Sequence, residues 1–411
     1  MGLVRSAFET LLTRALVTLI GVVITILVAR SLGPEGRGIF TIAMTIAAIG
    51  VQVGHLGLSS SNVYYASANQ GLLNMLIGNT LFFGVVGSTL VVLLIWLVFL
   101  YWPTYAPVSG PILSLALVWV PIGIGMLLIQ NLYLGMHKVR IYNFIELAKQ
   151  VGTLLSILFV YLLGYESPEL YFLVSLLIII VIFIAVVIHI ISGQGYRPEV
   201  SSRLFVEHAK YGIKAYFAML FAYLVLRIDL LMIQYLQGEL STGLYSIAVA
   251  IADVLILVPV AIGTVLFPRL SSLENDRERW LLTSRVVHWV ILVMVISTGL
   301  LLFIGSNLLV FLFGQEYSTA VPAMKILIPA VAILGINVVF MNYFASLGMP
   351  MISVISPALA AIVNIPANYL LIPIMGIIGA AWASLISYSL MLIMSLGYIR
   401  LLQKSSKSHE V

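Results

Sequence analysis

The chain has 411 residues, of which 62% are hydrophobic and 9% charged, with a mean hydropathy of +1.15 and a formal net charge of +5. This composition excludes a soluble globular enzyme, because a soluble core cannot bury so much apolar surface. The sequence contains no cysteine, which excludes disulfides, thiolate metal sites and cysteine nucleophiles.

Twelve apolar stretches are predicted to cross the membrane, since each has about 20 residues, the length of helix that spans roughly 30 Å of hydrocarbon. In chain order they cover residues 7–29, 38–61, 75–100, 111–135, 142–164, 169–191, 213–236, 243–266, 281–304, 323–346, 351–373 and 376–399. The first stretch is too long for a signal-peptide core and lacks a small-residue cleavage site before Arg30. We therefore predict an all-α polytopic membrane protein of about 12 transmembrane helices.

The longest polar connection lies between the sixth and seventh stretches and predicts two halves of six helices each. We expect an N-terminal six-helix bundle at 1–192, a cytoplasmic linker at 193–212, and a C-terminal six-helix bundle with a short tail at 213–411. Phe205, His208 and Tyr211 in the linker indicate a helix at the membrane surface. A solvated connector is the alternative.

An internal repeat supports two pseudo-symmetric bundles. A short repeat, Leu-Gly-Met, occurs at 134–136 and again at 347–349, an offset of 213 residues. Duplicated halves around a central site are typical of secondary transporters. A longer repeat, at an offset of 205 residues, pairs Gly33, Gly38, Phe40, Ile42, Ala43 and Ile46 with Gly238, Gly243, Tyr245, Ile247, Ala248 and Ile251.

The distribution of basic residues predicts the orientation. With the N-terminus in the cytoplasm, 14 of the 20 lysines and arginines fall on the cytoplasmic side, and Arg30 and Arg37 alone fall outside. Both termini are therefore expected in the cytoplasm. The basic pI follows from this topology, and no nucleic acid partner is needed to explain it.

Polar residues recur at helical spacing within the spans. In the first span Thr10, Arg14, Thr18, Gly21 and Thr25 share one helical face. Close helix packing is the alternative explanation for the small and hydroxylated members of such a face. Charged residues in hydrocarbon instead usually face a polar interior or a water-filled cavity.

Seven ionisable residues within the spans are the candidate site. Glu146 and Lys149 are three residues apart and can neutralise each other. Arg227 and Asp229 point to opposite sides of their helix, so Asp253 in the next span is the expected partner of Arg227. The candidate substrate-binding cations are Arg14, Lys149, Arg227 and Lys325, and the candidates for coupling or ion pairing are Glu146, Asp229 and Asp253.

A slight excess of cations in the spans suits an anionic substrate such as a phosphate or pyrophosphate. A buried Asp229 or Asp253 could also bind and release a proton, with structural ion pairing as the alternative. The histidines show no metal-ligand spacing, so no metal or organic cofactor is expected. Coupling to a proton or a sodium ion stays open.

Helix-breaking residues and the lack of enzyme motifs also favour a transporter. Pro259 corresponds to Gly54 at the offset of 205 residues, so the same span carries a weak point in both halves. Bending during transport and a static kink both explain it. The sequence has no phosphate-binding glycine loop, HExxH or GxSxG, and its outer loops are short and nearly uncharged. We expect no enzyme activity.

Four motifs resemble those of the polysaccharide and O-antigen flippases and occur in the same order. They are the run LVARSLGPEGRG at 27–38, Arg227-Ile228-Asp229 followed by Gly243-Leu244-Tyr245-Ser246-Ile247-Ala248, Phe267-Pro268-Arg269-Leu270, and Phe313-Gly314-Gln315-Glu316-Tyr317. The resemblance covers nearly the whole chain. It implies a member of the multidrug, oligosaccharidyl-lipid and polysaccharide exporter superfamily, with a cavity between two six-helix bundles.

The resemblance also implies a function. Such proteins move lipid-linked oligosaccharides, typically on undecaprenyl pyrophosphate, from the inner to the outer leaflet of the cytoplasmic membrane of bacteria or archaea by alternating access. The product serves O-antigen, lipopolysaccharide or related surface polysaccharides. The implied partners are the lipid-linked substrate, membrane lipids, a polysaccharide polymerase and glycosyltransferases. A cation-coupled multidrug exporter of the same fold, a lipid II-type flippase and a scramblase are the alternatives.

Overall fold

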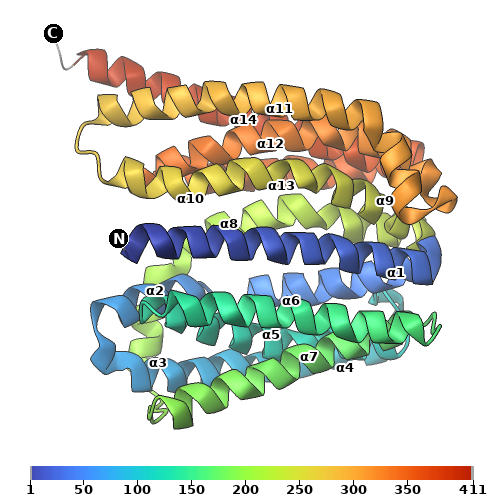
Figure 1. Cartoon of the computed structure of the whole chain (residues 1–411), viewed down its shortest axis with the longest axis horizontal. Helices are drawn as coiled ribbons and strands as arrows, with labels where there is room; N and C mark the ends of the chain where they lie inside the picture. The colour runs from blue at the N-terminus through green and yellow to red at the C-terminus, as the bar shows by residue number, and fades with distance from the viewer. Residues whose placement is uncertain (1, 409–411) are drawn as a thin grey trace. The chain divides into compact units, whose positions relative to one another are not determined.

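The computed structural model describes residues 2–408, with side chains from 9 to 404 except for 105, 214 and 215. These residues form helices joined by short turns, and no strand occurs among them (Figure 1). The predicted all-α fold is confirmed. The α-helices are α1 (Gly2–Gly54), α2 (Leu58–Ala68), α3 (Leu73–Asn79), α4 (Ser88–Tyr101), α5 (Pro111–Gly135), α6 (Val139–Leu162), α7 (Pro168–Ile188), α8 (Ser202–Gln237), α9 (Glu239–Ala252), α10 (Leu257–Ser271), α11 (Asp276–Phe313), α12 (Val321–Ser346), α13 (Ile352–Met375) and α14 (Ile377–Ser408).

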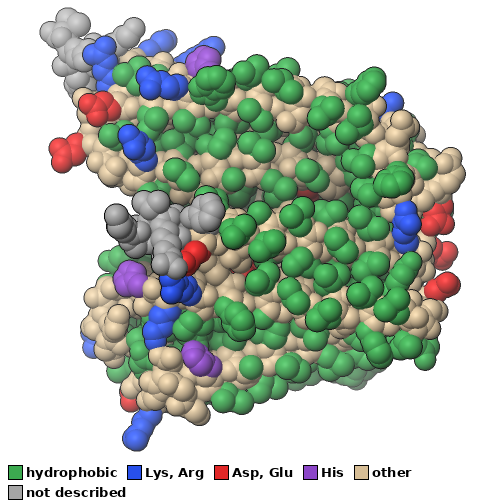
Figure 2. All heavy atoms as spheres, in the orientation of Figure 1, with side chains coloured by type: hydrophobic (Ala, Val, Ile, Leu, Met, Phe, Trp, Pro, Cys, Tyr) green, Lys and Arg blue, Asp and Glu red, His purple; other side chains and the backbone are tan. Residues whose placement is uncertain are grey.

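Eleven helical segments in the described part are long and apolar enough to span a membrane. The longest, Glu9–Gly54, contains Gly33 in a non-helical conformation. It therefore holds the first predicted span and most of the second, which agrees with about 12 transmembrane helices. On the visible face hydrophobic side chains cover most of the length of the helices, and most charged side chains gather near helix ends (Figure 2). This is the surface expected of a multi-pass membrane protein.

The chain divides into two compact units, Met1–Leu220 and Phe221–Val411. Helix α8 begins inside the stretch predicted as a linker and runs without a break to Gln237. The linker therefore contains the start of a long helix rather than a solvated connector. The proposed bundle limits at 192 and 213 stay a prediction.

Gly33 and Gly238, the first pair of the sequence repeat, adopt the same backbone conformation. Gly33 has φ 63° and ψ −178°, and Gly238 has φ 81° and ψ −172°. This region of positive φ and extended ψ is open essentially to glycine alone. Gly110 and Gly314, which are 204 residues apart, form a similar pair just before α5 and the short helix that leads into α12. The repeat is thus visible in the backbone of each unit.

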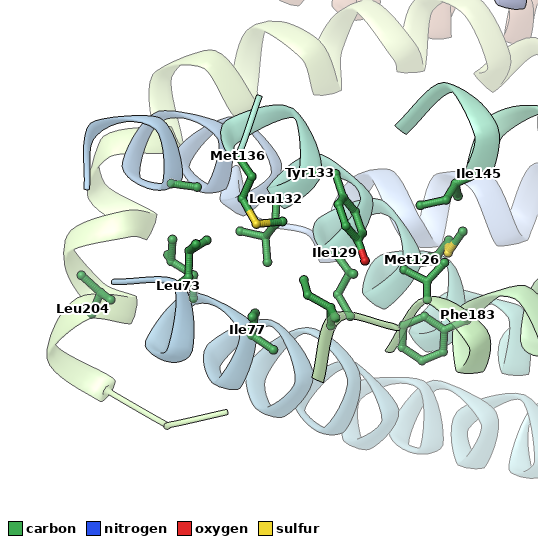
Figure 3. Close-up of a cluster of buried hydrophobic side chains, with 14 residues drawn as sticks. Leu73, Ile77, Met126, Ile129, Leu132, Tyr133, Met136, Ile145, Phe183 and Leu204 are labelled. Atoms are coloured by element: carbon green, nitrogen blue, oxygen red, sulfur yellow. The ribbon is translucent and has the colours of Figure 1, made fainter. Parts of the chain in front are cut away.

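A buried apolar cluster joins the helices of the first unit (Figure 3). Its members come from α2, α3, α5 and the residue after it, α6, α7 and the short π-helix after it, and Leu204 comes from α8. The first turn of α8 is therefore part of the first unit's core. The cluster consists of Ala66, Leu73, Leu76, Ile77, Met126, Ile129, Leu132, Tyr133, Met136, Ile145, Phe183, Val186, Ile190 and Leu204.

Residues 194–216, which we call the crossover segment, are fastened to the first unit by backbone contacts. The Asn79 side chain accepts a hydrogen bond from the Ser201 amide at 2.8 Å and donates one to the Ser201 carbonyl at 3.0 Å. Gly78 lies so close that a Cβ atom there would be 2.1 Å from the Glu199 carbonyl oxygen. The backbone of the segment therefore packs directly against Gly78, and a residue larger than glycine would not fit at that position.

Stacked aromatic rings fasten the next turns of the crossover segment. Phe205 stacks on Phe83 and His208 on Tyr65, each with ring centroids 4.0 Å apart. Burial lowers the pKa of His208 to about 4, although the nearby Glu207 charge acts in the opposite direction. His208 is therefore neutral at pH 7 and stacks as an uncharged ring.

We predict that Gly33→Ala and Gly238→Ala each destabilise the protein by about 1–3 kcal/mol, because alanine cannot relax in this region of φ and ψ. Thermal unfolding of the purified protein in detergent, followed by tryptophan fluorescence, measures the loss. Gly299→Ala is the control, since a Cβ at Gly299 has no neighbour within 4 Å. Equal melting temperatures for all three variants and the parent protein would contradict the requirement for glycine.

Candidate functional site

In the first unit, the polar face of α1 lies against α6. The Asn143 side chain donates to Thr10 Oγ1 at 3.1 Å, and further along the Ser31 hydroxyl donates to the Tyr165 carbonyl at 3.2 Å. These contacts show that α1 and α6 run in the same direction. A Cβ on Gly21 would lie 3.1 Å from the Gln150 side chain. Arg14, between Thr10 and Gly21, is therefore at the level of residues 143–150 of α6.

Glu146 and Lys149 form the predicted pair and share it with a glutamine. Lys149 Nζ lies 2.8 Å from Glu146 Oε1 and donates to Gln130 Oε1 at 3.0 Å. Gln130 in α5 donates in turn to Glu146 Oε1 at 2.6 Å. The three side chains form a closed hydrogen-bonded ring in which the charge of Lys149 is neutralised. Gln130 was not among the sequence candidates, because a single neutral amide in an apolar span gives no distinct signal.

Arg14 differs from Lys149 because no carboxylate compensates it. Its side chain is exposed on α1, and among the described residues none forms an ion pair with it. The Thr18 hydroxyl, one turn further on, donates to the Arg14 carbonyl at 2.9 Å, and Thr25 does the same to Gly21. Thr18 and Thr25 therefore form their hydrogen bonds within α1, which favours a packing role for them.

In the second unit, Arg227 and Asp253 lie together, as their spacing in the sequence suggested. Arg227 Nη2 is 3.1 Å from Asp253 Oδ2, and about one third of each side chain is exposed. Asp253 begins a short 3-10 turn, Asp253–Ile256, between α9 and α10. This tighter turn of the eighth span precedes Pro259, which has no amide hydrogen to bond to the Leu255 carbonyl.

Asp229 lies in a separate, fully enclosed environment. It is 2% exposed and accepts hydrogen bonds from the Tyr245 hydroxyl at 2.6 Å, the Leu230 amide at 2.8 Å and the Ser384 hydroxyl at 3.3 Å. All its described donors are neutral, because the adjacent Arg227 is bound to Asp253. Sequence reasoning missed both Tyr245, on the next helix, and Ser384, on a distant span, as its partners.

A buried amide chain lies between α13 and α14 in the same unit. Asn368 donates to Asn364 Oδ1 at 2.8 Å, and Asn364 donates to Ser387 Oγ at 3.1 Å. Oδ1 of Asn368 is buried and has no hydrogen-bond partner. Ser387 is one turn of α14 from Ser384, which contacts Asp229. The amide chain and the Asp229 site therefore contact neighbouring turns of α14.

Lys325 lies apart from the other candidates. It is exposed in the second turn of α12. Among the described residues, none forms an ion pair with it. A hollow of about 530 Å³ in the first unit, lined by residues at the starts of α5 and α7, contains none of the seven candidates. No group of three or more His, Asp or Glu side chains in the described part could hold a metal ion.

The sequence profile of the family described as polysaccharide biosynthesis protein matches residues 3–274. The chain belongs to this family. The predicted resemblance is therefore confirmed at the level of the family.

Two archaeal relatives match part of the chain. An uncharacterized membrane protein of Methanocaldococcus jannaschii is 25% identical over 253 residues, 59% of this chain and 50% of that protein. The probable low-salt glycan biosynthesis flippase of Haloferax volcanii is 21% identical over 175 residues, 42% of this chain and 37% of that protein. The matched stretches therefore span half or less of these relatives.

Solved structures of transporters share the fold. The inward-closed lipid II flippase MurJ has a TM-score of 0.75 and 15% identity, with 95% of this chain and 87% of that chain covered. An inward-facing MATE family multidrug transporter of the MOP superfamily has a TM-score of 0.76 and 14% identity, with 95% and 96% covered. At these identities the likeness shows the fold alone, which is that of MOP-type transporters.

We predict that the double variant Arg227→Met and Asp253→Leu is less destabilised than the sum of the losses caused by the two single substitutions. Each single change leaves one charge uncompensated in the span, and the coupling should be about 0.5–3 kcal/mol. Melting of the four proteins in detergent gives the value. The exposed pair Arg203 and Glu207, at 3.4 Å, is the control and should show almost no coupling. A coupling for Arg227 and Asp253 as small as the control would contradict the structural pair.

Proposed function

We propose that the protein moves an undecaprenyl-pyrophosphate-linked oligosaccharide from the inner to the outer leaflet of the bacterial or archaeal cytoplasmic membrane by alternating access. The transported glycan would serve synthesis of a surface polysaccharide of the O-antigen or lipopolysaccharide type. Membership of the polysaccharide biosynthesis family and a MOP-type fold support transport of a glycan precursor. The observation that carries the choice of an anionic lipid is Arg14.

An arginine that faces lipid without a counter-ion is unfavourable by several kcal/mol on most scales. Arg14 is therefore best explained by contact with water and an anionic ligand. Its planar guanidinium can hold a phosphate through two parallel hydrogen bonds. Lys149 is the second proposed contact, because Arg14 is at the level of the Glu146–Lys149 pair and a phosphate can replace Glu146 as the partner of Lys149.

Arg227 and Lys325 complete the proposed set of cations. Arg227 is held by Asp253 and is about one third exposed, so it can exchange that carboxylate for a phosphate oxygen. Lys325 is exposed near the start of α12 and would meet the headgroup late in transport. We propose that the bundles at 1–192 and 213–411 move so that the substrate site opens alternately to the two sides of the membrane. Both termini are proposed to lie in the cytoplasm.

Asp229 is the proposed coupling carboxylate. A buried acid whose described donors are all neutral can bind a proton, or a sodium ion with neighbouring oxygen ligands. The Ser384 hydroxyl and the unpartnered Asn368 Oδ1 support the second choice. Asp253 and Glu146 are proposed instead as ion-pair partners, because each already holds a cation.

The proposed partners are the lipid-linked oligosaccharide, surrounding lipids, and the glycosyltransferases and polymerase that make and use that lipid. A multidrug exporter with the same fold stays the main alternative, since MATE transporters share it. A lipid II-type flippase is a second, for the same reason. A scramblase would move the lipid without a gradient.

We expect Arg14→Ala to slow translocation roughly ten- to hundredfold, the effect of losing charge-assisted hydrogen bonds to a phosphate. The assay follows a fluorescent undecaprenyl-pyrophosphate oligosaccharide between leaflets of liposomes that contain the purified protein. Arg14→Lys should retain part of the rate, and Arg227→Ala should also lose it. Thr18→Ala is the control on the same face of α1.

The same assay separates the alternatives. Normal rates for both Arg14→Ala and Arg227→Ala would refute binding of the headgroup by these cations. Gradient-driven efflux of a cationic dye without lipid movement would identify a multidrug exporter. Faster movement of lipid II than of the oligosaccharide lipid would favour the lipid II-type flippase, and movement by the parent protein without any gradient would identify a scramblase.

Asp229→Asn is expected to remove the dependence of transport on an imposed proton or sodium gradient, because asparagine carries no charge to be compensated. The measurement compares rates with and without each gradient. Asp276→Asn, at an exposed helix start, is the control and should keep the dependence of the parent protein. A full gradient response in Asp229→Asn would assign the coupling to another group.

A further inference from the structure

The second predicted span of the first unit is interrupted by a strained turn. Helix α1 ends at Gly54, and α2 starts at Leu58. Leu56 has a φ of 47° and Gly57 a φ of 79°, and positive φ is unfavourable for leucine. Such strain persists only where surrounding contacts hold it, so the neighbours of this turn are informative.

Helix α8 supplies those contacts. In a continuous helix the Gly57 amide would donate to the Val53 carbonyl, but here it donates to His55 Nδ1 at 3.1 Å. The freed Val53 carbonyl accepts the Tyr216 hydroxyl of α8 at 2.8 Å instead. Straightening the span would return the Gly57 amide to Val53 and compete with Tyr216. The tyrosine therefore acts as a latch on the broken form.

A backbone contact locks the same place. A Cβ on Gly57 would lie 2.7 Å from the Gly212 carbonyl oxygen, and a Cβ on Gly212 would lie 2.4 Å from the Gly57 carbonyl oxygen. Glycine at both positions lets α8 touch the turn through its backbone. The His55 ring also packs edge-on against Tyr216, with centroids 5.4 Å apart.

The second unit has a corresponding arrangement. At Asp253–Ile256 the eighth span tightens to a 3-10 turn that keeps helical φ and ψ, which we call the second break, and Arg227 of the same α8 helix binds Asp253, the first residue of that turn. Gly54 and Pro259 are related by the repeat offset of 205 residues, and the two irregular points lie on opposite sides of this pair, after Gly54 and before Pro259. Tyr216 and Arg227 are 11 residues apart on α8, which is uninterrupted between them.

We infer that α8 is a connecting rod between two irregular points in membrane helices, bound to the broken turn at 55–57 by Tyr216 and Gly212 and to the 3-10 turn at 253–256 by Arg227. Each attachment lies within one unit. Opening one break releases or shifts the rod, and the change reaches the other break along a continuous helix. This coupling concerns the resting protein and does not depend on the identity of the transported molecule.

Hydrogen–deuterium exchange of the full-length protein in lipid nanodiscs tests this inference. Tyr216→Phe keeps the ring and removes only the hydrogen bond to Val53. We expect exchange roughly two- to tenfold faster at residues 54–58, the effect of one lost hydrogen bond, and faster exchange also at 253–257. Arg227→Lys should produce the reciprocal pattern, because coupling between two sites acts in both directions.

Two controls test whether the effect needs the Tyr216 hydrogen bond and a continuous α8. Tyr211→Phe removes a hydroxyl one turn earlier on α8 that has no hydrogen-bond partner among the described residues, so it should leave both breaks unchanged. Ala218→Gly together with Met219→Gly softens the rod between its attachments. In that background Tyr216→Phe should still loosen 54–58 but no longer affect 253–257.

Faster exchange at both breaks in Tyr216→Phe, lost in the softened rod, supports the inference. A change confined to 54–58 would overturn the rod, and no change at either break would overturn the latch. A remote effect that survives the two glycines would also overturn transmission along α8. If Tyr216→Phe folds poorly, Arg227→Lys answers the same question from the other end.

Discussion

The structure depends on one constraint of the membrane interior: a backbone amide or carbonyl there has no water to bond to and must find its partner within the protein. An unbroken helix meets this constraint by itself, whereas a broken one needs outside groups. At the break after Gly54, His55 and Tyr216 supply them. These side chains are placed where the break leaves the Gly57 amide and the Val53 carbonyl without helical partners. Because Tyr216 belongs to α8, this hydrogen bond also explains why α8 lies directly against the turn at Gly57.

The same constraint applies more strongly to charge, and it separates the ionisable residues into two kinds. Lys149 and Arg227 each have a carboxylate within 3.1 Å, so the protein itself stabilises them. Arg14 has no such partner among the described residues, and the described donors of Asp229 are neutral. These two groups are of opposite sign, and neither has a charged group among its described hydrogen-bond partners.

Much of this arrangement could be predicted from the sequence, because periodicity and spacing encode it. Hydropathy gave the spans, the repeat gave equivalent glycines, and helical geometry gave Asp253 as the partner of Arg227. Gln130 and Ser384 could not be found, since neutral polar residues in apolar spans are common and their contacts lie far away in sequence. The linker was predicted in part: its aromatic residues indicated a helix, but nothing in the sequence indicated the close backbone fit at Gly78 and Gly212.

Duplication explains why the two units are alike in backbone yet different in chemistry. Gly33 and Gly238 keep one conformation because no other residue adopts it without strain. The break after Gly54 and the 3-10 turn before Pro259 lie near a matched pair of residues but not at matched positions, and each is stabilised differently: by a hydroxyl on a carbonyl in one unit and by an ion pair in the other. The hydroxyl contact can be exchanged for a backbone hydrogen bond, whereas the ion pair can be exchanged for an anionic ligand. The first contact can therefore be replaced by the backbone itself, whereas the second needs another charged group.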